Sequence, residues 1–153
     1  MSRVYETVLY VHIVCAVIWV GGAFFAQLLA IRAERSTDAA EMIRTASSIE
    51  FLAQRVFIPA SILLFLAGLW MVIDRWEFEQ AWIAIAIVLW LASALVGSLY
   101  LGPMSKKIAQ AFESEGPTSS SGLAMTKRVF LVSRIELVGF AVIIFLMVFK
   151  PGA

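Results

Sequence analysis

Residues 8–31 read VLYVHIVCAVIWVGGAFFAQLLAI, an apolar run that contains the only histidine of the chain, His12. A helix of about 20 apolar residues crosses the roughly 30 Å hydrocarbon core of a bilayer. The run is longer than the apolar part of a signal peptide, and only Arg3 precedes it as a basic residue, so we expect it to remain in the mature protein. We predict a transmembrane helix here, extended backward to about residue 5.

Three further runs are long and apolar enough to cross a membrane, and their approximate bounds are 56–73, 81–101 and 129–149. Of the 153 residues, 61% are hydrophobic and 15% charged, whereas soluble domains average about 45–50% and 25%. The prediction is an all-α fold, an integral membrane antiparallel four-helix bundle that forms one domain over residues 1–153. The lipid bilayer is the expected partner. A net charge of +1 with scattered basic residues argues against nucleic acid.

The segments between the runs differ in character. Residues 32–55 are charged with apolar positions at helical spacing, which predicts an amphipathic helix on the membrane surface or an extension of the second span. Residues 74–80 form a short acidic turn, so the second and third spans make a tight hairpin. Residues 104–112 are basic and amphipathic. Residues 116–122 are rich in Gly, Pro and Ser and predict a flexible linker.

The basic residues predict the orientation of the bundle. Two long loops carry eight of them, namely Arg32, Arg35, Arg44, Arg55, Lys106, Lys107, Lys127 and Arg128. The opposite side has only Arg3, Arg75 and Lys150. Because basic loops stay in the cytoplasm, we expect both long loops inside and both termini outside.

One face of the first span carries unusual chemistry. At 3.6 residues per turn, His12, Cys15, Trp19 and Gly22 share that face, which should look inward. An intramembrane histidine either hydrogen-bonds to a neighbouring helix or binds a ligand or proton. Haem needs only one axial imidazole, whereas zinc needs three or four ligands. Copper(I) would use softer groups, namely Cys15 and Met71 or Met147.

The paired glycines of the first span and the basic residues at the outer membrane face each have two interpretations. Gly21 and Gly22, beside Trp19, either let two helices approach closely or make room for a porphyrin. Three cations at the outer face either meet the propionates of a ligand or anchor the helices at the interface; these are Arg3, Arg75 and Lys150.

Two charges lie within the fourth run. Arg134 and Glu136 point about 200° apart on a helix and cannot pair with each other. Arg134 can extend to the cytoplasmic interface. Glu136 needs a partner, for which the sequence offers Tyr100, Gln27 or Arg55, and it is also a candidate for a proton relay or for the coupling carboxylate of a transporter.

The chain resembles a bacterial family of predicted four-span integral membrane proteins of unknown function. The resemblance covers nearly the whole chain and rests on His12 with Trp19, Gly21 and Gly22, on Gly68-Leu69-Trp70 to Ala81-Trp82, on Leu101-Gly102-Pro103, and on residues 147–151. It implies a location in the bacterial cytoplasmic (inner) membrane.

More distantly, the chain is similar to HemJ-type protoporphyrinogen oxidases and to CopD-type copper-resistance membrane domains. The HemJ-type resemblance implies that His12 binds b-type haem. It does not extend to the last helix, where Asn-Glu is replaced by Ile135-Glu136, or to the lysine of the third helix, which is replaced within residues 82–86. Whether the chain is an enzyme is therefore left open.

The leading hypothesis from the sequence is a membrane protein that binds b-type haem through His12, with a redox-associated role. The alternatives are a copper-handling membrane protein, a structural or accessory membrane subunit, and a small transporter. With one histidine in the chain, a sixth iron ligand would come from Met71, from Met147, or from a further subunit in a homo-oligomer or with a partner membrane protein.

Overall fold

Long helices make up the molecule. The computed structural model describes residues 2–36, 38–76, 78–116 and 118–152. The elements in chain order are α1 (Arg3–Glu34), α2 (Ala39–Leu52), the π-helical turn η1 (Ala53–Phe57), α3 (Ile58–Arg75), α4 (Ala81–Val96), the π-helical turn η2 (Gly97–Leu101), α5 (Gly102–Glu115) and α6 (Ser120–Phe149). The described residues contain no strand.

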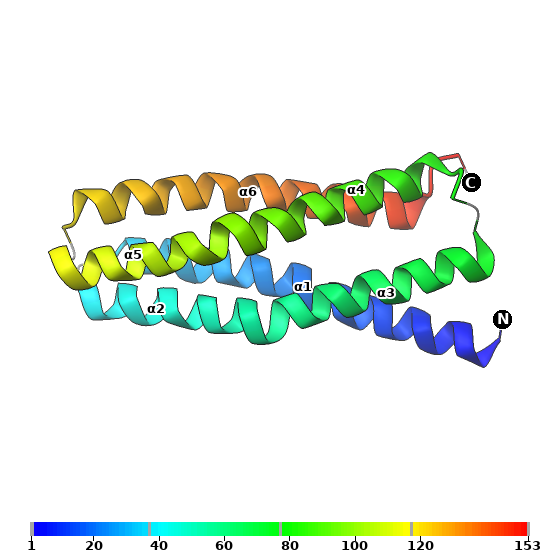
Figure 1. Ribbon diagram of the computed structural model, residues 1–153, viewed down its shortest axis with the longest axis horizontal. Coiled ribbons are helices and arrows are strands. Elements are labelled where there is room, and N and C mark those ends of the chain that lie inside the picture. Colours follow the sequence, from blue (N-terminus) through cyan, green and yellow to red (C-terminus); the bar gives the residue numbers. More distant parts are fainter. Residues whose placement is uncertain (1, 37, 77, 117, 153) are drawn as a thin grey trace.

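These elements form four antiparallel rods (Figure 1). α2, η1 and α3 are continuous, as are α4, η2 and α5. Both termini lie at one end of the bundle with the α3–α4 turn, and the α1–α2 and α5–α6 turns lie at the other, which we name the loop end. Among the described residues, four helices are long and apolar enough to cross a membrane. The predicted all-α membrane helical bundle is confirmed.

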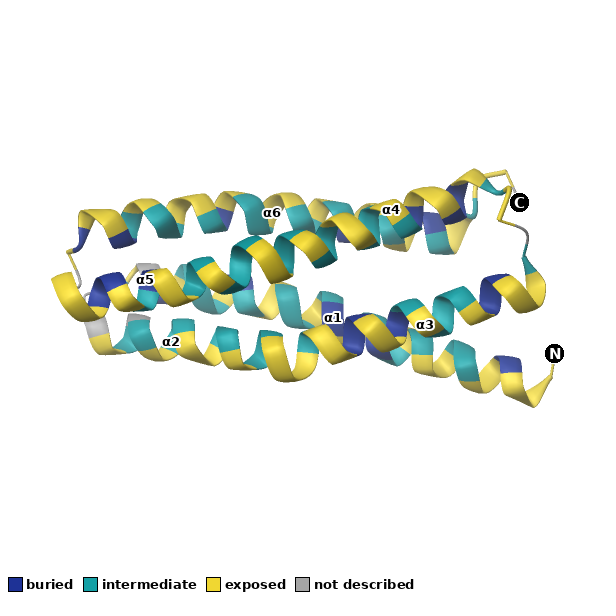
Figure 2. Ribbon diagram, viewed as in Figure 1, coloured by how far each residue is buried: buried dark blue, intermediate teal, exposed yellow. Residues whose placement is uncertain are grey.

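The rods are longer than a bilayer is thick. α1 has 32 residues, which at 1.5 Å per residue make about 48 Å against a hydrocarbon core of about 30 Å. Apolar side chains cover much of the outer surface, including Val17, Phe24, Leu66 and Val138, each of which is more than half exposed. Figure 2 shows this exposed outer face along the rods. Such a continuous apolar exterior is suited to lipid.

The structure decides what the connecting segments form. For residues 39–55 it shows the second alternative, an extension of the second span, and not a separate surface helix, because α2 continues through η1 into α3 and packs against α5. Residues 104–112 belong to α5, the corresponding extension of α4. The flexible linker predicted at 116–122 is wrong for Ser120–Gly122, which are helical, while Pro117 lies outside the described residues. The Ser119 side chain caps α6 by accepting from the Gly122 N–H at 3.0 Å.

Two prolines explain the π-helical turns. Pro59 and Pro103 lack an N–H, and a proline ring collides with the carbonyl four residues earlier, which here belongs to Arg55 and Leu99 within η1 and η2. A wider turn relieves that collision, and its i→i+5 hydrogen bonds are present from the Ile58 N–H to the Ala53 carbonyl and from the Gly102 N–H to the Gly97 carbonyl. Because α2 and α5 both have 14 residues, the turns lie at similar heights.

Candidate functional site

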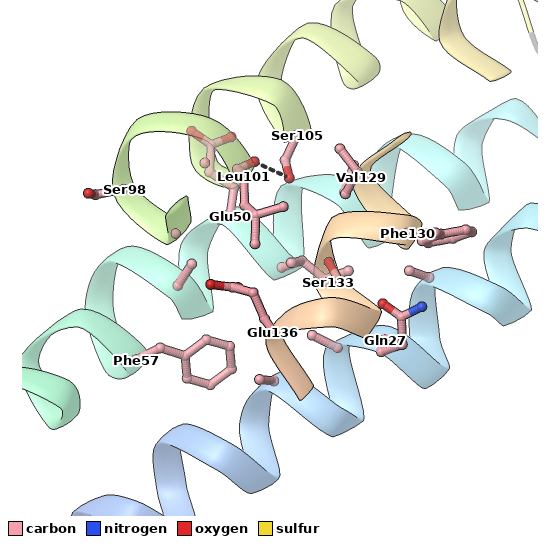
Figure 3. Close-up of a pocket in the computed structure, with 18 of the residues that line it drawn as sticks. Gln27, Glu50, Phe57, Ser98, Leu101, Ser105, Val129, Phe130, Ser133 and Glu136 are labelled. Carbon is pink, nitrogen blue, oxygen red and sulfur yellow. Dashed lines mark hydrogen bonds between the residues drawn. The ribbon is translucent and has the colours of Figure 1, made fainter. Parts of the chain in front are cut away.

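A cavity of about 370 Å³ lies inside the bundle and extends from just beyond the two π-helical turns toward the loop end. On α1 it is lined by small side chains one turn apart, namely Ala23, Ala26, Ala30 and Ala33. η1 contributes Phe57, and η2 contributes Ser98 and Leu101 (Figure 3). The alanines leave space that larger residues would fill, and π-helical turns are frequent at functional sites. The fold thus places a pocket within the membrane-spanning helices.

Three buried polar atoms in the described part of the chain have no hydrogen-bond partner, and all three belong to residues that line this cavity. They are Gln27 Nε2, Trp90 Nε1 and Glu136 Oε1. Gln27 is only 7% exposed. An unpaired buried polar group costs about 1–3 kcal/mol, so native proteins keep few of them. Because all three residues line one cavity, that cavity is the candidate site.

Glu136 projects from α6 into the cavity. Figure 3 shows Glu136 and Gln27 on the two sides of Ser133. The Ser93 side chain of α4 is a hydrogen-bonding neighbour of the Glu136 carboxyl group. Of the partners that the sequence offers for Glu136, Gln27 lines the cavity with it, whereas Tyr100 and Arg55 lie outside the lining.

A second carboxylate, Glu50 of α2, also lines the cavity, and it accepts a hydrogen bond from Gln54 Nε2 at 3.3 Å. Among the described residues that line the cavity, none is Lys, Arg or His. Arg134, which the sequence groups with Glu136, is exposed and lies outside the lining. The ionisable side chains among the described lining residues are consequently all acidic.

Aromatic rings form the rigid parts of the wall. Trp19 and Phe140 are in contact, with their centroids 4.6 Å apart, at the end of the cavity away from the loops. Trp90 stacks on Phe65 with centroids 4.1 Å apart and planes inclined by 15°. These contacts hold the faces of Trp19 and Trp90 in fixed positions at the pocket.

His12 lies outside the lining of this cavity, where α1 packs against α3. Its Nδ1 is 2.9 Å from the Leu64 carbonyl oxygen. Because a carbonyl can only accept, Nδ1 carries the proton and Nε2 is the unprotonated nitrogen. A Cβ at Gly68 would lie 3.0 Å from His12 Cε1, so Gly68 is what allows the ring to fit between the helices.

The other residues predicted around a haem do not enclose a common space with His12. Trp19 packs on Phe140 and Gly22 lies against the Phe57 ring. Gly21 is exposed, with nothing within 4 Å of a Cβ built on it. In this arrangement, the residues near His12 fit one another more closely than they fit a macrocycle.

The three outer cations are not gathered at His12 either. At 3.6 residues per turn, the nine positions from Arg3 to His12 make about 2.5 turns, so Arg3 lies on the opposite face of α1. Arg75 lies 4.8 Å from the centroid of the Tyr5 ring and 3.4 Å from Asp74. Lys150 lies 4.5 Å from the centroid of the Trp76 ring. These contacts suit residues that anchor helix ends at the membrane interface.

Metal chemistry finds little support in the described residues. They contain no cluster of three or more His, Cys, Asp or Glu side chains that would hold an ion. Cys15 is 6% exposed and packs in an apolar cluster with Trp19, Leu64 and Phe140.

The sequence missed Trp90 and Ser93 as site residues and treated Gln27 only as a partner for Glu136. Gln27 had a usable signal, because it is the one amide side chain in the run 8–31. Trp90 and Ser93 had none beyond being polar within a span. Whether Trp90 and Ser93 line the cavity depends on how the third rod is rotated in the bundle.

The fold and the cavity define the class, a multi-span helical membrane protein with a mainly apolar pocket inside its bundle. The chain belongs to the family described as "Predicted integral membrane protein (DUF2269)", whose model matches residues 6–151. This confirms the predicted membership of a membrane family of unknown function. No curated protein and no solved structure matches the chain. The family description names neither HemJ-type nor CopD-type proteins.

Proposed function

We propose that the protein binds a small molecule within the bilayer, as the binding step of a small transporter. The observation that supports this proposal is that Gln27, Trp90 and Glu136, each with a buried side-chain atom that lacks a partner, all line one cavity. Intramembrane carboxyl groups that face a cavity mark substrate and ion pathways. Transporter sites are also commonly built where spanning helices depart from regular geometry, as η1 and η2 do here.

A solute screen tests binding in the cavity. The purified protein is heated with sets of small cationic, anionic and neutral aromatic solutes, and the unfolding temperature is measured. We expect at least one set to raise it for the wild type but not for Ser133→Trp, because the indole fills the cavity. Leu131→Trp is the matched control, since Leu131 is 61% exposed on the outer face of the same helix. If no solute distinguishes wild type from Ser133→Trp, the proposal fails.

Transport is tested separately in lipid vesicles. Solutes that stabilise the wild type are expected to enter vesicles that contain the protein faster than empty vesicles or vesicles with Ser133→Trp. Equal entry into all three would leave a binding protein without a transport role.

We also propose that both termini face outward and that both long loops lie in the cytoplasm of a bacterial cell with the protein in its inner membrane. The proposal is supported by the eight basic residues of segments 32–55 and 106–128 and by the position of the α1–α2 and α5–α6 turns at one end of the bundle. A reporter protein inserted at Thr118 is expected to behave as cytoplasmic, and one fused after residue 152 as periplasmic. The reverse pattern would invert the orientation.

Haem binding at His12 is the second proposal, and one contact favours it. The hydrogen bond from Nδ1 to the Leu64 carbonyl leaves Nε2 free for iron, the arrangement usual for metal-bound histidines. When bound, haem would supply one-electron chemistry. Met71, Met147 or a further subunit would supply the sixth iron ligand.

Haem binding makes a spectroscopic prediction. Protein purified from cells supplied with haem is expected to show a Soret band and a pyridine haemochrome that are absent in His12→Ala. Ile13→Ala, a change at the exposed neighbouring position, should retain both. A folded wild type without haem would leave His12 as a packing residue between α1 and α3.

A further inference from the structure

The charge of the cavity indicates the charge of its ligand, an inference that rests on the proposed function. Glu50 and Glu136 are the ionisable side chains among the described lining residues, and neither has a basic partner in the lining. Gln54 already donates to Glu50, whereas Glu136 Oε1 is unpartnered. A buried carboxylate in apolar surroundings is costly until a cation or a proton neutralises it. One cationic group therefore suits this site.

The side chains of the cavity wall indicate the chemical character of the uncharged part of the ligand. Trp19, Phe57, Trp90 and Phe140 present aromatic rings to the same space as Glu136. Aromatic faces attract organic cations and pack well against apolar groups. An inorganic ion would leave most of this surface without contacts, whereas an aromatic or aliphatic body would cover it.

Two donors indicate a second polar group on the ligand. Gln27 Nε2 and Trp90 Nε1 both carry protons, lie buried and have no acceptor. An ammonium group cannot satisfy them because it is itself a donor. A hydroxyl or ether oxygen on the same molecule would accept from one or both.

We infer that the cavity binds an apolar organic monocation, an amine whose ammonium group pairs with Glu136 and whose hydroxyl or ether oxygen accepts from Gln27 or Trp90. Its apolar body lies among the aromatic side chains. Gln27, 7% exposed and unpartnered, is the observation that makes the acidic pocket a ligand site rather than a set of isolated carboxylates.

Propranolol is a suitable probe because it combines a naphthyl ring, an ether, a hydroxyl and a protonated amine. Two matched molecules isolate the charge, the neutral 3-(1-naphthyloxy)-1,2-propanediol and the anionic 1-naphthoxyacetate. Binding is measured by equilibrium dialysis with the full chain in lipid nanodiscs, and binding to empty nanodiscs is subtracted because amines partition into lipid. We expect saturable binding of the amine, roughly tenfold tighter than that of the diol, and none of the acid.

Two variants test the proposed ligand contacts, one with Glu136 and one with Gln27. Glu136→Gln is expected to remove the preference for the amine over the diol. Gln27→Leu is expected to weaken both probes by roughly tenfold, because it removes the amide donor. Glu113→Gln, at an exposed carboxylate of α5, is the control and should bind as the wild type does.

The outcomes separate the ligand class from the function. Equal binding of all three probes, or an amine preference that survives Glu136→Gln, overturns the cationic class. Unchanged affinity in Gln27→Leu overturns the acceptor contact. If no probe binds while other solutes stabilise the wild type but not Ser133→Trp, the class is wrong and the binding function stands. If no solute does so either, both fail.

Discussion

Glu136→Leu is expected to give a protein at least as stable as the wild type that no longer distinguishes the amine probe from its neutral analogue. Oε1 is buried and unpartnered, and no basic side chain lies among the described residues that line the cavity with Glu136. Removing a buried carboxyl group of which one oxygen lacks a partner recovers more desolvation free energy than the loss of its contact with Ser93 costs, and the leucine fills part of the space. We expect a gain of about 1 kcal/mol in the free energy of unfolding and a loss of roughly tenfold in amine affinity, which is the size of the amine preference.

The measurement pairs unfolding in mixed micelles with dialysis in nanodiscs for wild type, Glu136→Leu and Glu136→Gln. Glutamine keeps the shape and a hydrogen-bonding group but not the charge, so it should lose the amine preference without the gain in stability. A buried partner for Glu136, which the sequence predicted, would instead make Glu136→Gln better tolerated than Glu136→Leu. A Glu136→Leu protein that is less stable than wild type by more than about 1 kcal/mol would show that the carboxyl group is mainly structural.

The second large effect concerns two adjacent glycines. Gly22→Leu is expected to destabilise the bundle by about 1–3 kcal/mol, because a Cβ there overlaps the Phe57 ring of η1. Gly21→Leu is expected to change stability by less than about 0.5 kcal/mol, because Gly21 is exposed and nothing lies within 4 Å of its Cβ position. The two variants have the same composition and differ only in the face of α1 that they alter.

Unfolding in mixed micelles measures both variants, and a double variant tests the cause. Phe57→Ala with Gly22→Ala is expected to be more stable than the sum of the two single changes predicts, because the smaller side chain accommodates the new methyl group. Equal effects of leucine at positions 21 and 22 would contradict the close approach of α1 to η1.

The architecture was predictable because it depends on local properties of the chain. Apolar length predicts the four crossings, and the spacing of His12, Cys15 and Trp19 correctly places Cys15 and Trp19 on a buried face of α1. The segment 116–122 was mispredicted because its composition indicates flexibility, whereas the Ser119 cap starts α6 within it. A cap is a local hydrogen bond that composition does not record.

The site was less predictable because it depends on rotation and distance between rods. The sequence identified Glu136 as an intramembrane carboxyl group but assigned it partners by depth alone. Arg3 was grouped with His12 by membrane face, although the helical angle between them separates the two. Gln27 and Trp90 meet at one cavity only because the first and third rods turn those positions inward.

The π-helical turns that precede Pro59 and Pro103 also determine which face of each rod lines the cavity. On the second rod, positions 45, 49, 53, 57 and 61 all line the cavity, and on the third rod positions 90, 94, 98 and 102 do so. In a regular helix, sixteen residues make about 4.4 turns, so a spacing of four would rotate by about 160° from position 45 to position 61. Each π-helical turn, with more residues per turn, offsets part of this drift. The same stripe of each rod therefore continues from the apolar span into the extension beyond it, and a one-residue deletion in η1 would rotate Glu50 away from the space it shares with Ser61.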